Sequence, residues 1–172
     1  VWANVEAAAA TLQLPLQALR QVLREEYDED VGEEVGGFRW RYAMAGAKNR
    51  HNRIAANING SLWARLRGTP CEPFNSDTKV RIRLASGTRY YYPDAMVVCS
   101  PNPDDDSFQD APAIIVEVIS KSTRRIDEGE KKDAYLAIPG LGAYLVVEQD
   151  FPLVVVHRAG PAGFQREVIK GL

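Results

Sequence analysis

The feature that most constrains the fold is a short segment, residues 113–120, AIIVEVIS, in which both alternating sets of side chains are apolar. A strand with one solvated face alternates apolar and polar residues, so this pattern predicts a strand covered on both faces. Such a strand lies inside a sheet. Glu117 interrupts the segment, and because an ionised carboxylate is almost never buried without a partner, another group must compensate its charge.

Hydrophobic periodicity predicts the elements around this segment. Helical spacing of apolar residues occurs in residues 15–26, 48–67 and 127–137. Strand patterns occupy residues 79–84, 90–99, 113–120, 143–148 and 153–158, and the first two are expected to form a hairpin. The order α-α-β-β-β-α-β-β predicts one α/β domain over residues 1–172, a central mixed β-sheet flanked by helices, with an N-terminal helical extension at about residues 1–30.

Composition excludes several classes of protein. The longest charge-free stretch falls far short of the roughly 18 apolar residues that suggest a membrane-spanning helix, so no membrane partner is expected. The formal net charge of −2 means that any nucleic-acid surface must be local. With only Cys71 and Cys99, the chain can form neither a disulfide framework nor a four-cysteine zinc site, and a reduced, cytoplasmic setting is expected.

A second acid, Asp94, lies in the strand pattern YYYPDAMVVC, directly after Pro93, which suits a strand edge or a bulge. If this strand neighbours the one that contains Glu117, the two carboxylates are cross-strand partners with Cβ atoms about 5 Å apart. Both can then bind one hard divalent cation such as Mg²⁺. The alternative is that each acid pairs with an arginine or lies at an exposed strand end.

Lys131 belongs to the inward face of the helix predicted at 127–137. Three apolar residues follow it at i+3, i+4 and i+7: Ala134, Tyr135 and Ile138. Its neighbour Lys132 follows Glu128 by four residues, the spacing of an exposed ion pair. Two carboxylates, a divalent ion and a lysine suit phosphodiester hydrolysis, because the metal lowers the pKa of bound water and lysine stabilises phosphate charge.

The segments YYYPDAMVVC, IIVEVISKST and DEGEKKDAY, with YAMAGAKNRHNRIAANI upstream, resemble the Uma-two family of endonucleases within the PD-(D/E)XK superfamily. The resemblance spans roughly residues 33–158 and implies a restriction endonuclease-like fold with Mg²⁺-dependent cleavage of nucleic-acid backbones. It implies that Asp94 is the acid of the PD motif, Glu117 the second acid, and Lys131 the lysine of the GEK segment. Mn²⁺ is the alternative metal.

In two places the sequence departs from the pattern of the resemblance. Two residues after the second acid, where the usual lysine of the superfamily would share the strand face, this chain has Ile119. The lysine must then come from the following helix as Lys131, and Lys121 is its rival. A further acid is expected upstream of the YAMAG segment, where Glu34 or Glu33 can fill the role. The alternative for both acids is an exposed turn.

Residues 48–67 contain five basic residues and no acid, in a chain of net charge −2. This stretch is the expected polyanion-facing surface, with a solvated basic helix face as the alternative. His51 matches the histidine that follows YAMAG in the family, so it is expected to line the site or orient a phosphate; a capping or surface role is the alternative. The expected nucleic-acid contacts are Arg50, His51, Arg53 and Lys121.

These observations predict a Mg²⁺-dependent endonuclease that hydrolyses phosphodiester bonds of nucleic acid, with DNA as the expected substrate. The candidate catalytic residues are Asp94, Glu117, Lys131 and Glu34. By analogy with nucleases of this fold, a homodimer is expected, because cutting two strands needs two sites. The alternative is a catalytically inactive nucleic-acid-binding or dimeric regulatory module on the same fold, and a metal-binding structural protein is a third reading.

Overall fold

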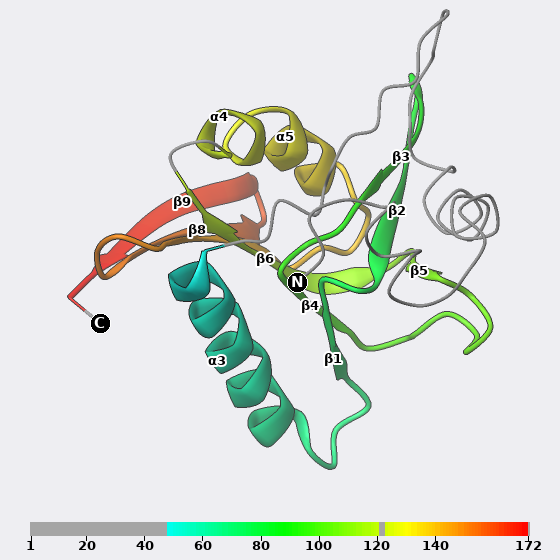
Figure 1. The fold of residues 1–172 in the computed structure, drawn as a ribbon. Helices are drawn as coiled ribbons and strands as arrows, with labels where there is room; N and C mark the ends of the chain where they lie inside the picture. The colour runs from blue at the N-terminus through cyan, green and yellow to red at the C-terminus, as the bar shows by residue number, and fades with distance from the viewer. Residues whose placement is uncertain (1–47, 121–122, 172) are drawn as a thin grey trace, which may run out of the picture. The chain divides into compact units, whose positions relative to one another are not determined.

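Figure 1 shows the computed structural model, which describes residues 48–120 and 123–171. All of these residues belong to one structural unit, Met44–Leu172. Several expectations lie outside the described residues: the helix at 15–26, the N-terminal extension, Glu33, Glu34 and Lys121.

The described residues contain three helices and nine strands. The helices are α3 (Asn49–Leu66), α4 (Arg124–Asp127) and α5 (Glu130–Leu136). The strands are β1 (Glu72–Asn75), β2 (Lys79–Leu84), β3 (Gly87–Tyr91), β4 (Ala95–Val98), β5 (Phe108–Gln109), β6 (Pro112–Ile119), β7 (Ala143–Glu148), β8 (Leu153–Gly160) and β9 (Gly163–Lys170). In this part of the chain no helix has the length and apolar character that crossing a bilayer requires.

Six of the described strands form one mixed sheet in the order β1-β4-β6-β7-β8-β9. Strand β6 pairs with β4 in antiparallel orientation and with β7 in parallel orientation, and the other neighbours in this sheet are antiparallel. Strand β6 carries the AIIVEVIS pattern, and its residues from Ile115 to Ile119 are buried. The prediction of a mixed sheet with this strand inside it is therefore confirmed.

Three other strands form a smaller sheet in the order β3-β2-β5. The antiparallel pair β2–β3 is the predicted hairpin. The strand predicted over residues 90–99 is divided, because the chain leaves β3 at Tyr91 and enters β4, in the other sheet, at Ala95. Pro93 lies in this break, where its missing N–H removes no bond from a ladder. The break places Asp94 directly before β4.

Helices flank the larger sheet (Figure 1). Helix α3 packs on β1, β4 and β6, and α4 and α5 pack on β6 and β7 from the other side. The core between the sheet, α5 and β2 is formed mainly by buried aliphatic and tyrosine side chains, among them Val80, Ile82, Met96, Ile115, Ile119, Tyr135, Tyr144 and Val146. Helix α3 packs less deeply: its inward side chains Ile54, Ile58, Leu62 and Leu66 are half-buried.

The helix predicted at 127–137 is divided into α4 and α5 at Gly129. This residue has φ −113° and ψ −105°, outside the helical region. A Cβ atom at this position would lie 2.6 Å from the carbonyl oxygen of Arg125, so only glycine fits without a shift of the backbone. Lys131 lies in the first turn of α5, directly after this junction.

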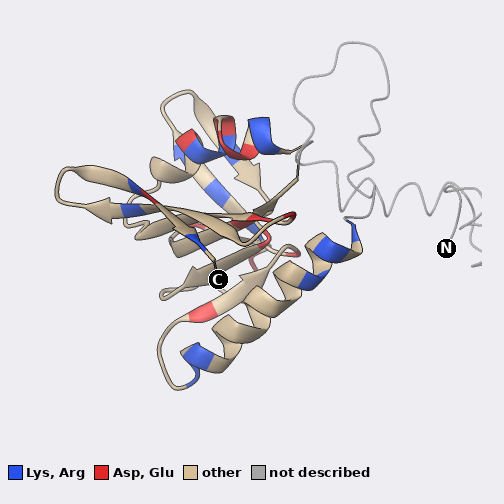
Figure 2. Cartoon of the chain, turned by 90° about the vertical axis from the view of Figure 1, so that its left-hand side faces the viewer, with Lys and Arg blue, Asp and Glu red and all other residues tan. Residues whose placement is uncertain are grey.

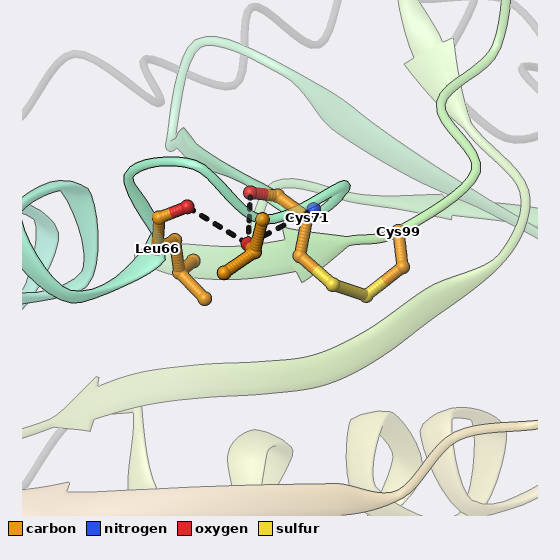
Figure 3. The surroundings of a disulfide bond; sticks show 4 residues. Leu66, Cys71 and Cys99 are labelled. Atoms are coloured by element: carbon orange, nitrogen blue, oxygen red, sulfur yellow. Dashed lines mark hydrogen bonds between the residues drawn. A yellow bond between two sulfur atoms is a disulfide. The ribbon is translucent and has the colours of Figure 1, made fainter.

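Cys71 and Cys99 form a disulfide (Figure 3). Glu72 of β1 pairs with Val98 of β4, so the cysteines occupy the next cross-strand position. Thr69 supports this corner, because its Oγ1 donates a 2.8 Å hydrogen bond to a carbonyl oxygen of α3 and accepts one from the Cys71 amide. The expectation of reduced cysteines is therefore wrong: the strands bring together two residues that lie 28 positions apart. Cysteine content no longer supports a cytoplasmic setting.

Candidate active site

Asp94 and Glu117 come together because β4 and β6 are neighbours. Ala95 pairs with Val116 in the antiparallel register, so Asp94 and Glu117 occupy the next position along the two chains. The Val118 amide of β6 donates a 2.7 Å hydrogen bond to Asp94 Oδ2, which fixes the acid against this strand. The adjacency on which the metal hypothesis depends is thus present in the structure.

Helix α3 fixes Asp94 from the other side. His51 Nε2 lies 2.9 Å from Asp94 Oδ1, and the Asn59 side-chain amide donates a 3.0 Å hydrogen bond to the Asp94 backbone carbonyl. The side chains of His51 and Asp94 are 18% and 15% exposed, so this contact is largely shielded from water. The sequence predicted that His51 lines the site or contacts nucleic acid, and in the structure its ring contacts Asp94, a candidate metal ligand.

Helix α5 supplies the two side chains that stabilise the buried carboxylate of Glu117. Lys131 Nζ lies 3.0 Å from Glu117 Oε1, and the Tyr135 hydroxyl donates a 2.8 Å hydrogen bond to the same oxygen. The Glu117 side chain is only 5% exposed. Lys131 therefore faces the sheet, as the apolar stripe of the helix predicted, and its charge meets the buried acid.

Burial dominates the electrostatics of this group. Burial raises the pKa of Glu117, Lys131 opposes the shift, and the nearby carboxylates of Asp127 and Asp94 add to it, so that the pKa rises to about 7. Burial alone would lower the pKa of Lys131, but the charges of Glu117 and Asp127 outweigh it and raise that pKa. Lys131 is therefore an ammonium ion at neutral pH, and Glu117 binds a proton far more readily than an exposed glutamate.

Asp127 is a member of this cluster that the sequence reasoning missed. Its side chain is 4% exposed, and its Oδ1 lies 3.0 Å from Lys131 Nζ. The Tyr144 hydroxyl donates a 2.9 Å hydrogen bond to its backbone carbonyl. The available signal was its spacing, because an acid four residues before an inward-facing lysine shares a helical face with it.

The exposed partner predicted for Lys132 is different in the structure. Lys132 Nζ lies 3.6 Å from Asp133, and Glu128 instead pairs with Arg124 at 3.1 Å. All four of these charged side chains are at least 30% exposed, whereas Glu117 and Asp127 beside Lys131 are nearly buried. Lys132 is thus half-buried at 30% exposed rather than fully solvated, and its predicted ion pair with Glu128 is replaced by the one with Asp133.

The basic residues of α3 lie at its two ends (Figure 2). Arg50 and Arg53 are exposed in the first turns, next to His51, and Arg50 contacts Asp150 at 3.5 Å. Because His51 contacts Asp94, the basic N-terminal end of α3 lies beside the carboxylate pair. Exposed cations next to a candidate hydrolytic site can hold a polyanionic backbone there.

The donor set suits Mg²⁺. This ion prefers oxygen ligands and usually keeps several waters, so it needs only one or two protein carboxylates, which Asp94 and Glu117 can supply. Within residues 48–120 and 123–171, no three Asp, Glu, His or Cys side chains gather in a group that could hold a metal.

The chain has a restriction endonuclease-like fold, and a comparison with solved structures shows this directly. A solved structure from Anabaena variabilis, titled a putative nuclease belonging to DUF820, superposes with a TM-score of 0.59 at 15% sequence identity. The match covers 73% of this chain and 69% of that one. The predicted fold class, α/β with a central mixed sheet and flanking helices, is therefore confirmed.

Residues 40–171 match the model of the Uma2 family, which is described as "Putative restriction endonuclease". The uncharacterized protein sll1609 of Synechocystis sp. is 33% identical over 137 residues, which cover 78% of this chain and 75% of that protein. A second Synechocystis protein, slr1290, is 36% identical over 107 residues, 62% of this chain and 55% of its own length. The chain belongs to the Uma2 family, as the motifs of its sequence predicted.

Proposed function

We propose that this protein is a Mg²⁺-dependent endonuclease that hydrolyses phosphodiester bonds of nucleic acid, with DNA as its substrate. The observation that carries the proposal is the meeting of Asp94 and Glu117 across β4 and β6, with Lys131 Nζ 3.0 Å from Glu117. Membership of a family described as restriction endonucleases supports the same reading.

Each residue of the site has a role in this proposal. Asp94 and Glu117 hold the ion, and Mn²⁺ can replace Mg²⁺ because it accepts the same oxygen ligands. The bound ion supplies an activated water and neutralises phosphate charge. His51 and the Val118 amide keep the Asp94 carboxylate in place. Lys131 stabilises the negative charge that develops on the phosphate, as a positioned ammonium ion can in a water-poor site.

The nucleic-acid backbone is proposed to follow the basic end of α3. Arg50 and Arg53 are exposed there beside the carboxylate pair, so they can contact phosphates on either side of the cleaved bond. Lys121 remains a proposed phosphate contact of the site. Glu34, with Glu33 as its alternative, remains its proposed further acid. A homodimer remains proposed as well, because a cut in both strands of a duplex requires two such sites.

The proposal is tested with purified protein on supercoiled plasmid, single-stranded DNA and RNA, each with Mg²⁺, Mn²⁺ or EDTA. We expect cleavage of DNA that EDTA abolishes and that Glu117→Gln and Lys131→Ala both strongly reduce. Glu128→Gln is the matched control, because this nearby acid pairs with Arg124 outside the site. Cleavage that survives Glu117→Gln would contradict the proposal, and loss with Glu117→Gln alone would shift the lysine role to Lys121.

One observation favours a second function, a nucleic-acid-binding module without catalysis. Ile119, at the strand position where the wider superfamily usually has lysine, is fully buried, so that face of β6 offers no charged group beyond Glu117. This function predicts salt-dependent DNA binding with no cleavage under any metal. The same purified protein distinguishes the two functions when binding and cleavage are measured on one DNA.

A further inference from the structure

We propose that Asp127 is a positioning residue, which holds the Lys131 ammonium group in the candidate active site when Glu117 is engaged by the metal ion. The inference rests on the proposed function and deepens it, because neither the sequence motifs nor the family description assigns a role to Asp127. Asp127 carries a buried charge that the packing of the fold does not require.

The first observation is the burial of Asp127. Its side chain is 4% exposed at the end of α4, and the contact to Lys131 Nζ at 3.0 Å is the ion pair that compensates its charge. An ionised carboxylate at such a depth is unfavourable without a partner, and an apolar residue would fill the same space more favourably. A buried acid aimed at a site lysine is therefore better explained by that lysine than by packing.

The second observation is that Lys131 has two carboxylate partners at the same distance. Its Nζ lies 3.0 Å from Glu117 Oε1 and 3.0 Å from Asp127 Oδ1. Glu117 is also a proposed metal ligand, and a metal ion beside it repels a neighbouring ammonium group. With Glu117 as its only partner, Lys131 would leave the site upon metal binding. Asp127 gives it a partner that does not depend on Glu117.

The third observation is that hydrogen bonds hold the backbone of Asp127 at both its amide and its carbonyl. Its amide donates a 3.0 Å hydrogen bond to the Thr123 carbonyl, and its own carbonyl accepts the 2.9 Å bond from Tyr144. Its ion pair with Lys131 crosses the junction of α4 and α5 at Gly129. The Asp127–Lys131 ion pair therefore joins the two helices as well as holding the lysine. The experiment must separate a structural role of Asp127 from a positioning role.

Three variants separate the roles. Asp127→Asn removes the charge and keeps the shape, Glu128→Gln makes the same change at the adjacent exposed acid, and Lys131→Met removes the ammonium group. We expect Asp127→Asn to lower kcat about 10–100-fold with little change in KM, as loss of an orienting partner does. In the Lys131→Met background the same change should alter the rate less than about twofold, because the two residues act as one unit.

Two measurements do not depend on cleavage. The first is the ¹H–¹⁵N signal of the Lys131 ammonium group, assigned by its absence in Lys131→Met. With MgCl₂ present, so that Glu117 is engaged by the metal ion, the signal should be present in the unaltered protein and in Glu128→Gln and absent in Asp127→Asn. The second is calorimetry with MnCl₂, in which Asp127→Asn should change the Kd less than about threefold, whereas loss of a metal ligand typically costs much more.

Several results would overturn the inference. These are an unchanged kcat in Asp127→Asn, an ammonium signal that persists without the carboxylate, additive effects in the double variant, or a large loss of Mn²⁺ affinity, which would make Asp127 a metal ligand. If Asp127→Asn does not fold, Asp127→Ser, which also removes the carboxylate, replaces it, and an unchanged rate and signal in that variant would overturn the inference. Absence of cleavage in the unaltered protein would refute the proposed function, while the ammonium signal would still test the positioning.

Discussion

Replacing Lys131 with methionine tests the electrostatics of the cluster without any substrate. The change removes the ammonium group that lies 3.0 Å from Glu117 and 3.0 Å from Asp127, whose side chains are 5% and 4% exposed. Methionine preserves most of the apolar stem of lysine, so the loss of stability reports the charge rather than a cavity. Removal of one partner from a buried ion pair costs about 3–5 kcal/mol, because the remaining charge stays buried.

The loss of stability caused by Lys131→Met should depend on pH, and the titration of Glu117 determines whether it grows or shrinks as the pH rises. Its folded-state pKa is raised from 4.5 to about 7, chiefly by burial. Because the folded protein binds this proton more tightly than the unfolded chain, Glu117 contributes about 3 kcal/mol to the free energy of unfolding below about pH 4.5. This contribution is lost as the pH rises through about 7. At about pH 9, Lys131→Met leaves both buried carboxylates without a cation, so we expect the full 3–5 kcal/mol loss.

At about pH 5, Glu117 is protonated in both proteins, so only the Lys131–Asp127 pair distinguishes them, and we expect roughly half of that loss. The assay is urea unfolding at the two pH values, followed by circular dichroism. Lys132→Met is the matched control, since its partner Asp133 is 76% exposed and the expected loss is under about 1 kcal/mol. Equal losses at both pH values, or a loss no larger than that of Lys132→Met, would refute the reasoning.

Three further predictions follow from other parts of the structure. His51→Gln should weaken Mn²⁺ binding about 10–100-fold in calorimetry, because the ring contacts a proposed metal ligand, while Asn57→Ala on the exposed side of the helix should not. Arg50→Ala with Arg53→Ala should weaken DNA binding and reduce the slope of log Kd against log salt by about 1–2 in fluorescence anisotropy; an unchanged slope would exclude this end of the helix from the interface. Cys71→Ser should lower the free energy of unfolding by about 2–4 kcal/mol under non-reducing conditions, and an equal stability in both proteins would show that the disulfide contributes little.

The centre of the fold could be predicted because its signals are local. Apolar side chains on both faces of residues 113–120 indicate an internal strand whichever strands flank it. The carboxylates stood out because burial makes an acid in such a strand unfavourable, and the inward direction of Lys131 follows from helical periodicity alone. The sequence predicted that Asp94 and Glu117 meet only if their strands are neighbours, and the antiparallel pairing of β4 and β6 meets that condition.

The parts that were missed depend on contacts between distant residues. Strand β1 is only four residues long and contains Pro73, and β5 contains two residues, so neither has a hydrophobic period to detect. The division into two sheets and the Cys71–Cys99 disulfide follow from strand pairing, which local patterns do not specify. The break at Gly129 is instead local, because this residue has a non-helical backbone in which a Cβ atom would lie 2.6 Å from the Arg125 carbonyl oxygen.

The most direct test of the proposed metal site is an anomalous difference map from crystals grown with MnCl₂. We expect one strong peak between Asp94 and Glu117, with oxygen atoms of both carboxylates roughly 2.0–2.3 Å from it. Crystals of Glu117→Gln grown in the same way should show no such peak. A peak that persists in that variant, or manganese bound elsewhere while the pair of acids stays unchanged, would contradict the assignment of these carboxylates as metal ligands.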